Sequence, residues 1–406
     1  MSRAITPPSA SIGSTTTVHA GRGTAAAILC AAAPGDVAVL YEPAVEHLLK
    51  EIGRLHPHHR LACRRVDRPP MLTDLDETVG WLQASPAAAL VAVGGGRVLD
   101  LAKLAVALAG TPGSVRHLGQ LARRAGYAPL PGALTTGLPL LAVPTTLGTG
   151  AEVSSVAVVS GAGGDRTLVY SPSLRPTVAV LDPLATSTLP GRLAREGALE
   201  AMLRVAGAHI GCPSSVRMAN TEALLLTRQL AQALDECGDE EEPGDDLRLF
   251  IAQLSNATHR GWALAGRSPF PSPLWFLAAE LSAVLGVTKI AATAMLLPAW
   301  LERVAAGDAR WGDHDRLTAT WPAMSGTAAH LDSDVAGATR SMLRCWHLEP
   351  ERVDAGPDAV EQVSRRLMRR WGGRLPMLGR FGEDDLGALV GDALAALPAD
   401  IATARM

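Results

Sequence analysis

The chain has 406 residues, which is long enough for two domains. Its formal net charge is −3 at pH 7, and a chain this close to neutral is not expected to have nucleic acid or an anionic membrane surface as its main partner. No apolar stretch is long enough to cross a membrane. The five scattered cysteines lack CxxC spacing and indicate reduced thiols, so we expect a cytoplasmic protein.

Residues 1–16 are rich in Ser, Thr and Pro, and we expect them to form a flexible tail. Apolar runs typical of buried strands then alternate with helical patterns as far as residue 185. Glu42 follows the predicted strand 37–41. An acid at this place commonly accepts hydrogen bonds from an adenosine ribose, which would favour NAD over NADP. A solvated turn residue is the alternative.

A second predicted strand, 87–93, leads into three glycines and then a helical pattern. Gly94, Gly95 and Gly96 let the backbone turn sharply and approach a ligand closely. Because free N–H groups and the positive end of the helix point at this turn, a phosphate or pyrophosphate is the expected ligand. A glycine turn without any ligand is the alternative.

A loop of hydroxyls and glycines, 144–153, follows the predicted strand 139–143. Short hydroxyl side chains beside flexible backbone suit contact with ribose or phosphate oxygens, so two such loops at strand ends predict a shared ligand. The stretch 111–137 between them is rich in Gly, Pro and Arg and is predicted to be irregular. Further strands are predicted at 154–159, 167–170 and 177–181.

From residue 186 onward, apolar residues recur at helical spacing. The sequence therefore predicts an α/β dinucleotide-binding domain at 17–185 and an all-α domain at 186–406.

The patterns GGGxxxDxxK at 94–103 and PTTxGTGxEV at 144–153 resemble those of the superfamily of iron-containing alcohol dehydrogenases, glycerol dehydrogenases and dehydroquinate synthases. The segments 178–183, 189–192 and 291–298 are similar to the same family. The resemblance implies the dehydroquinate synthase-like fold, a homodimer, and NAD or NADP held by the two loops. Including Glu42, the predicted cofactor-binding residues are Glu42, Gly94, Gly95, Gly96, Asp100, Lys103, Thr145, Thr146, Thr149 and Arg166.

The chain departs from this family at the metal site. The family usually binds a divalent metal through an acid, a His four residues later and two further histidines. These positions hold Glu200, Arg204, Trp275 and Lys289. One carboxylate cannot hold a catalytic Zn²⁺ or Fe²⁺ alone, and arginine, lysine and indole are not ordinary ligands. We therefore expect no catalytic metal.

The replacements carry positive charge. Glu200 and Arg204 are spaced i, i+4 and can pair on one helix face, and Lys289 adds a second cation. A fixed cation could stabilise a developing alkoxide or hold a substrate carboxylate, and Lys289 could act as general acid/base. The alternative is that these residues form a salt-bridged domain interface at a site that has lost its catalytic function. His259, on the helix before Trp275, is a further catalytic candidate.

The leading prediction is a metal-independent, NAD(P)-dependent oxidoreductase that interconverts an alcohol and a carbonyl, with the nicotinamide against Lys289 and Trp275. The arginine-rich composition indicates specialised metabolism. The resemblance implies a possible peptide natural-product substrate, because some relatives in this superfamily act on such peptides, and oxidation of a β-hydroxy acid there would lead to loss of CO₂. A non-catalytic dinucleotide-binding scaffold, or a partner subunit of a biosynthetic complex, is the alternative. A cyclase or lyase of the dehydroquinate synthase type is disfavoured because that chemistry depends on the metal.

Overall fold

We describe the protein from a computed structural model that covers residues 15–397 apart from 56–57, 59, 69, 133, 135–136, 162–164, 239–241, 327–329, 332, 351–352 and 354. The predicted tail therefore lies outside the described residues except for its last two positions. The chain divides into two compact units. Unit 1 lies within Met1–Ala206 and Ser214–Arg267, and unit 2 lies within Gly207–Pro213 and Ser268–Met406.

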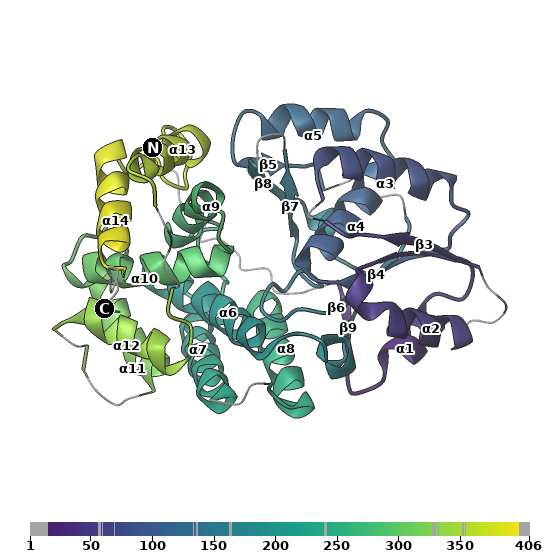
Figure 1. Ribbon diagram of the computed structural model, residues 1–406, viewed down its shortest axis with the longest axis horizontal. Coiled ribbons are helices and arrows are strands. Elements are labelled where there is room, and N and C mark those ends of the chain that lie inside the picture. Colours follow the sequence, from purple (N-terminus) through teal and green to yellow (C-terminus); the bar gives the residue numbers. More distant parts are fainter. Residues whose placement is uncertain are drawn as a thin grey trace, which may run out of the picture. The chain divides into compact units, whose positions relative to one another are not determined.

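Unit 1 is built on a six-stranded sheet in the order β1-β9-β6-β4-β2-β3, in which all neighbouring strands are parallel (Figure 1). The apolar runs predicted as strands form its centre, with Val91 of β4 paired to Val39 of β2 and to Leu141 of β6. The edge strand β1 is short and its side chains are exposed or half-buried, so the sequence has no apolar run there that would predict a strand. The strands are β1 (Thr17–Ala20), β2 (Val37–Tyr41), β3 (Leu61–Arg65), β4 (Ala89–Gly94), β6 (Leu140–Pro144) and β9 (Val178–Leu181).

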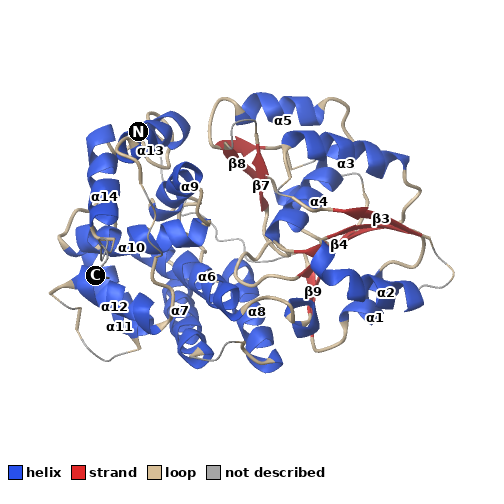
Figure 2. Ribbon diagram, viewed as in Figure 1, coloured by secondary structure: helices blue, strands red, loops and turns tan. Residues whose placement is uncertain are grey.

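Helices cover both faces of this sheet, because successive side chains of a strand point to opposite sides. Val91 and Val93 pack in one core with α1 (Ala25–Ala32) and α2 (Glu46–Leu55). Leu90 and Ala92 pack in a second core with α3 (Leu72–Ala84) and α4 (Gly96–Ala109). The predicted α/β region, in which strands alternate with helices, is confirmed, and it is doubly wound (Figure 2).

The stretch 111–137 is more regular than predicted. It contains α5 (Ser114–Ala122) and β5 (Tyr127–Pro129), which joins β8 (Arg166–Tyr170) and β7 (Val156–Ser160) in a small sheet of order β5-β8-β7. Three residues are too few to show a strand pattern, and β5 is recognisable only through its partner β8. Ala157 and Val169 of the small sheet pack in the same core as α4.

The remainder of the described chain is helical, as the sequence predicts. The helices α6, α7 and α8 belong mainly to unit 1, so the compact α/β unit extends beyond the predicted boundary at 185. Hydrogen bonds from α6 and α8 to the loop 144–153 account for this difference. None of the described helices is long and apolar enough to span a membrane. The helices are α6 (Gly191–Gly211), α7 (Arg217–Cys237), α8 (Asp245–Arg260), α9 (Leu274–Leu285), α10 (Lys289–Ala305), α11 (His314–Ser325), α12 (Val335–Cys345), α13 (Ala359–Trp371) and α14 (Glu383–Ala395).

Candidate active site

The glycine turn links β4 to α4 at the carboxyl edge of the sheet. Gly95 is the N-cap residue of α4 and has no side chain with which to cap the helix. The positive end of the helix therefore suits an anion. Glu42, directly after β2, reaches the same turn: Oε2 accepts a hydrogen bond from the Gly95 N–H at 3.2 Å, and Oε1 accepts one from the Thr145 hydroxyl. The structure thus brings three predicted cofactor-binding residues together.

The threonine loop, residues 144–153, lies directly on the glycine turn. The Thr145 N–H donates to the Gly94 carbonyl at 3.2 Å, and a Cβ added to Gly95 would lie 3.0 Å from Thr146 Cγ2. The buried Oγ1 of Thr146 has no hydrogen-bond partner among the described residues. An unpaired buried hydroxyl next to the start of a helix fits a phosphate or ribose oxygen. The two loops therefore fit the phosphate part of a dinucleotide.

Lys103 holds the threonine loop and the small sheet against α4. The acceptors around its Nζ are Ala151 O (3.0 Å), Ser154 Oγ (3.1 Å), Val156 O (2.5 Å) and Asp100 Oδ1 (2.9 Å). An ammonium has three protons, so these acceptors satisfy it, and the residue is only 1% exposed. This geometry differs from the predicted cofactor contact: Lys103 positions the loop that would make the contact.

Asp100 is the second residue of this network. Its Oδ2 accepts a hydrogen bond from the Val158 N–H of β7 at 2.9 Å. Burial raises the pKa of Asp100, and the neighbouring Lys103 ammonium opposes that rise. The predicted cofactor residue Arg166 starts β8 opposite Ser160, two residues along β7 from Val158.

The second half of the threonine loop packs between α6 and α8. Gly148 has a φ of +91°, and a Cβ there would lie 2.2 Å from the Gly197 carbonyl oxygen of α6. Gly150 has a φ of +59°, and a Cβ there would lie 2.1 Å from His259 Cδ2 of α8. Only glycine fits either position, so packing against these helices requires the two glycines whether or not a ligand binds.

Arg204 of α6 fastens this half of the loop. Its Nη2 donates to the carbonyl oxygens of Gly148 (2.5 Å) and Thr149 (3.3 Å), and its Nη1 donates to Thr258 Oγ1 of α8 (2.8 Å). The predicted partner Glu200 places Oε1 3.9 Å from Nη2. Burial lowers the pKa of Arg204, against the opposing charge of Glu200. Three of the five N–H donors of its guanidinium are thus directed at backbone carbonyls and a hydroxyl, and this geometry favours Arg204 as a positioning residue over a group that holds a substrate carboxylate.

His259 lies beside Gly150 with its Nε2 buried and without a hydrogen-bond partner among the described residues. Burial lowers its pKa well below the ordinary value, and the positive charges of Arg204 and Lys103 lower it further. The imidazole is therefore neutral at pH 7. A neutral imidazole next to the cofactor loop can accept a proton or a hydrogen bond from a bound group.

Sequence reasoning did not single out the buried Glu152 and Asn256 as site residues. Asn256 Nδ2 donates to Glu152 Oε1 at 3.0 Å, which ties α8 to the threonine loop, and burial raises the pKa of Glu152. Glu152 belongs to the PTTxGTGxEV pattern and could have been noticed, whereas nothing in the sequence marks Asn256.

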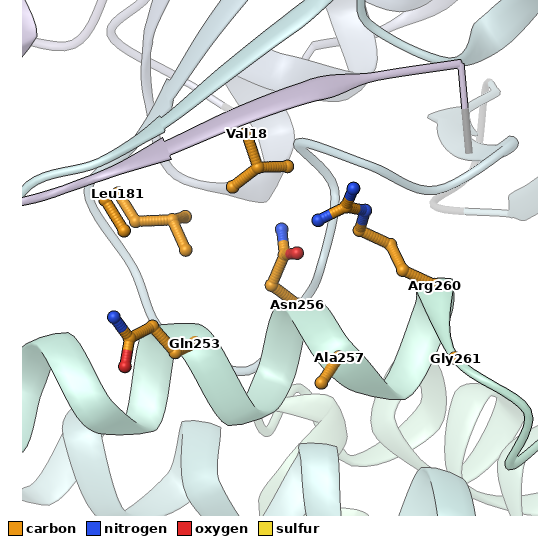
Figure 3. A pocket seen from close by; sticks show the side chains of 8 residues that line it. Val18, Leu181, Gln253, Asn256, Ala257, Arg260 and Gly261 are labelled. Carbon is orange, nitrogen blue, oxygen red and sulfur yellow. The ribbon is translucent and has the colours of Figure 1, made fainter. Parts of the chain in front are cut away.

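A pocket of about 570 Å³ runs along α8. Figure 3 shows Asn256 and Arg260 directed from the helix into this space, toward Val18 of β1. The pocket contains none of the predicted site residues; it is lined by Val18, Ala20, Leu181, Gln253, Asn256, Ala257, Arg260 and Gly261.

In unit 2, the predicted site residues Lys289 and Trp275 lie together. Lys289 is the first residue of α10, and its Nζ lies 4.4 Å from the centroid of the Trp275 ring of α9, which is a cation–π contact. The four positions that we assign by resemblance to metal ligands thus hold an acid and a cation, Glu200 and Arg204, in unit 1 and a cation–π pair, Lys289 and Trp275, in unit 2. Only Glu200 among them is an ordinary ligand, and no group of three or more His, Cys, Asp or Glu within the described ranges could hold a metal ion. These residues do not fit a catalytic divalent metal.

The α/β part of the chain is similar in sequence to proteins of a known family. The sequence model of the iron-containing alcohol dehydrogenase family matches residues 16–183. Long-chain-alcohol dehydrogenase 1 of Geobacillus thermodenitrificans is 32% identical over 182 residues, which are 43% of this chain and 43% of that protein. Phosphonoacetaldehyde reductase of Streptomyces viridochromogenes is 36% identical over 191 residues, 46% of this chain and 47% of that protein. The matched region thus spans less than half the length of either relative.

The fold is shared over almost the whole chain. The solved structure of a sulfoacetaldehyde reductase from Bifidobacterium kashiwanohense in complex with NAD⁺ superposes with a TM-score of 0.74 and 18% identity, covering 95% of this chain and 99% of that one. This likeness confirms the predicted combination of a parallel α/β region followed by a helical region.

Proposed function

We propose that this protein is a nicotinamide-dependent oxidoreductase that interconverts an alcohol and a carbonyl compound, because residues 16–183 match the sequence model of the iron-containing alcohol dehydrogenase family. The observation that carries the proposal is the contact between the glycine turn and the threonine loop, with the start of α4 at the turn and the unpaired hydroxyl of Thr146 beside it. When bound there, a nicotinamide cofactor would supply or accept a hydride.

The backbone of Gly95 and Gly96 and the hydroxyls of Thr145 and Thr146 would hold the cofactor phosphates. NAD is favoured over NADP, since a carboxylate directly after β2, as in Glu42, can accept hydrogen bonds from the adenosine ribose and would repel a phosphate on that ribose. Lys103, Asp100 and Arg204 would act indirectly, by fixing the loops that make these contacts.

We infer that the reaction needs no metal, because the residues at the ligand positions do not fit one. In the direction of reduction, Lys289 would donate a proton from Nζ to the carbonyl oxygen while hydride reaches the carbonyl carbon, giving an alcohol and the oxidised cofactor. Trp275 would position the ammonium through the cation–π contact.

The proposed substrate class is a small or peptide-borne alcohol that carries an acidic group, such as a β-hydroxy acid in specialised metabolism. The name of the Streptomyces relative, a phosphonoacetaldehyde reductase, supports an aldehyde that bears an anionic group. A cation at the ligand position would suit such a substrate.

The test is a spectrophotometric assay of the purified full chain, with NADH or NADPH and a panel of neutral and anionic aldehydes, and with NAD⁺ and the corresponding alcohols and β-hydroxy acids. We expect cofactor-dependent turnover, fastest with the anionic members. Dinucleotide binding without turnover of any compound would favour the scaffold, and absence of dinucleotide binding would exclude both functions.

A further inference from the structure

The carboxylate of Glu42 occupies the part of the glycine turn that suits an anion. Strands β2 and β4 are neighbours in the sheet, and the Glu42 N–H donates to the Val93 carbonyl at 3.2 Å, so the residue after β2 is carried to the start of α4. From there Oε2 accepts from the Gly95 N–H at 3.2 Å and Oε1 accepts from the Thr145 hydroxyl.

The charge of Glu42 is stabilised by the groups that a phosphate would use. Within the part of the chain that the structure describes, Glu42 forms no ion pair. Its partners are one backbone N–H, one hydroxyl and the positive end of α4. A second anion at this turn would compete for these donors and would be repelled by the carboxylate.

We propose that Glu42 takes the place of the cofactor phosphate in the free protein, and that its carboxylate leaves the glycine turn when the pyrophosphate group binds. Glu42 then sets the affinity for phosphate ligands through a contact that exists only before binding. The inference rests on the proposed function, because it assumes that the turn receives the phosphates of a dinucleotide.

A role in the bound state makes the opposite prediction. If Glu42 served only as an acceptor for ribose hydroxyls, its charge would have no effect on a ligand that contains phosphates and no ribose. Inorganic pyrophosphate is such a ligand, and it separates competition at the turn from recognition of the sugar.

The experiment is calorimetric titration of the full chain with inorganic pyrophosphate, comparing wild type, Glu42→Gln and Glu46→Gln. Glutamine keeps the length of the side chain and one acceptor oxygen but removes the charge. We expect Glu42→Gln to tighten pyrophosphate binding by about fivefold or more, the effect of one unit charge some 4 Å away in a mostly aqueous setting. Glu46→Gln removes a charge from the start of α2, where the 51% exposed side chain lies 3.7 Å from Arg65, and should leave the affinity unchanged.

A second variant, Glu42→Ala, removes both the charge and the hydrogen bonds and should also bind pyrophosphate more tightly than wild type. Circular dichroism spectra identical to wild type would show that each variant is folded. Equal or weaker pyrophosphate binding in both Glu42 variants, or no binding by any form of the protein, would overturn the proposal. The proposed function has a separate test: it fails if the affinity for pyrophosphate changes in Glu42→Gln but neither NAD⁺ nor NADP⁺ binds to the protein.

Discussion

The predicted cofactor loops and the four positions that we assign to metal ligands compare differently with the family pattern. In the loops, the glycines and threonines of the pattern are present, and the structure brings them into contact with each other and with Glu42. At the ligand positions three of four residue types differ, yet the cations are not left isolated. Arg204 is bonded to the threonine loop and Lys289 lies on the Trp275 ring.

The two regions are connected through Arg204, which we assign by resemblance to a histidine-ligand position. Arg204 donates hydrogen bonds to the carbonyls of Gly148 and Thr149, in the loop that we propose to contact the cofactor. The conformation of that loop therefore depends on the residue at the assigned ligand position. The following experiments separate the chemical role of the altered positions from this structural role.

The largest expected effect is on catalysis. Lys289→Met should lower kcat by about 10²- to 10⁴-fold through loss of the general acid/base, with the Kd for NAD⁺ unchanged. Lys50→Met, at an exposed position of α2, is the matched control and should retain full activity. A Lys289→Met enzyme with wild-type kcat would remove this lysine from the chemistry.

Stability should respond most strongly at Arg204. Arg204→Met leaves the carbonyl oxygens of Gly148 and Thr149 without their charged donor, so we expect a loss of about 3 kcal/mol in the free energy of unfolding, measured by urea titration. Arg192→Met, on the same helix but 44% exposed and paired with Glu196, should cost no more than about 1 kcal/mol. Equal losses in the two variants would contradict the loop-fastening role.

His259 should make the protein less stable in mild acid. Its pKa in the folded state lies below that in the unfolded state, so between these values the unfolded chain binds more protons and stability falls as the pH decreases below about 6.5. The decline is at most about 1.4 kcal/mol per pH unit and should shrink in His259→Gln, as seen in thermal melts at pH 7 and pH 5. The exposed His314→Gln should leave the slope as in wild type; an unchanged slope in His259→Gln would contradict the assignment.

The smallest effect is the coupling between Trp275 and Lys289. A double-mutant cycle with Trp275→Leu and Lys289→Met, followed by urea unfolding, should give a coupling energy of about 0.5–1 kcal/mol for the cation–π contact. A coupling energy of zero would mean that the two side chains do not interact in solution.

The sequence predicted the elements with strong local patterns and missed those that depend on tertiary contacts. The strands β2, β4 and β6 and the two loops were found because apolar runs and glycine patterns lie within short segments. The strand β5 pairs with residues about 40 positions away, and Asn256 meets Glu152 across 104 positions, so neither leaves a local signal. The burial that turns Lys103 and Arg204 into positioning residues is likewise a property of the packed structure.

We propose that the cofactor site works without a catalytic metal. The most direct measurement is elemental analysis of the purified protein together with cofactor-linked turnover before and after exhaustive treatment with a chelator. We predict metal well below one ion per chain, and turnover that neither falls after chelation nor rises on addition of Fe²⁺ or Zn²⁺. One bound ion per chain, with turnover that is lost on chelation and restored by the metal, would contradict the account.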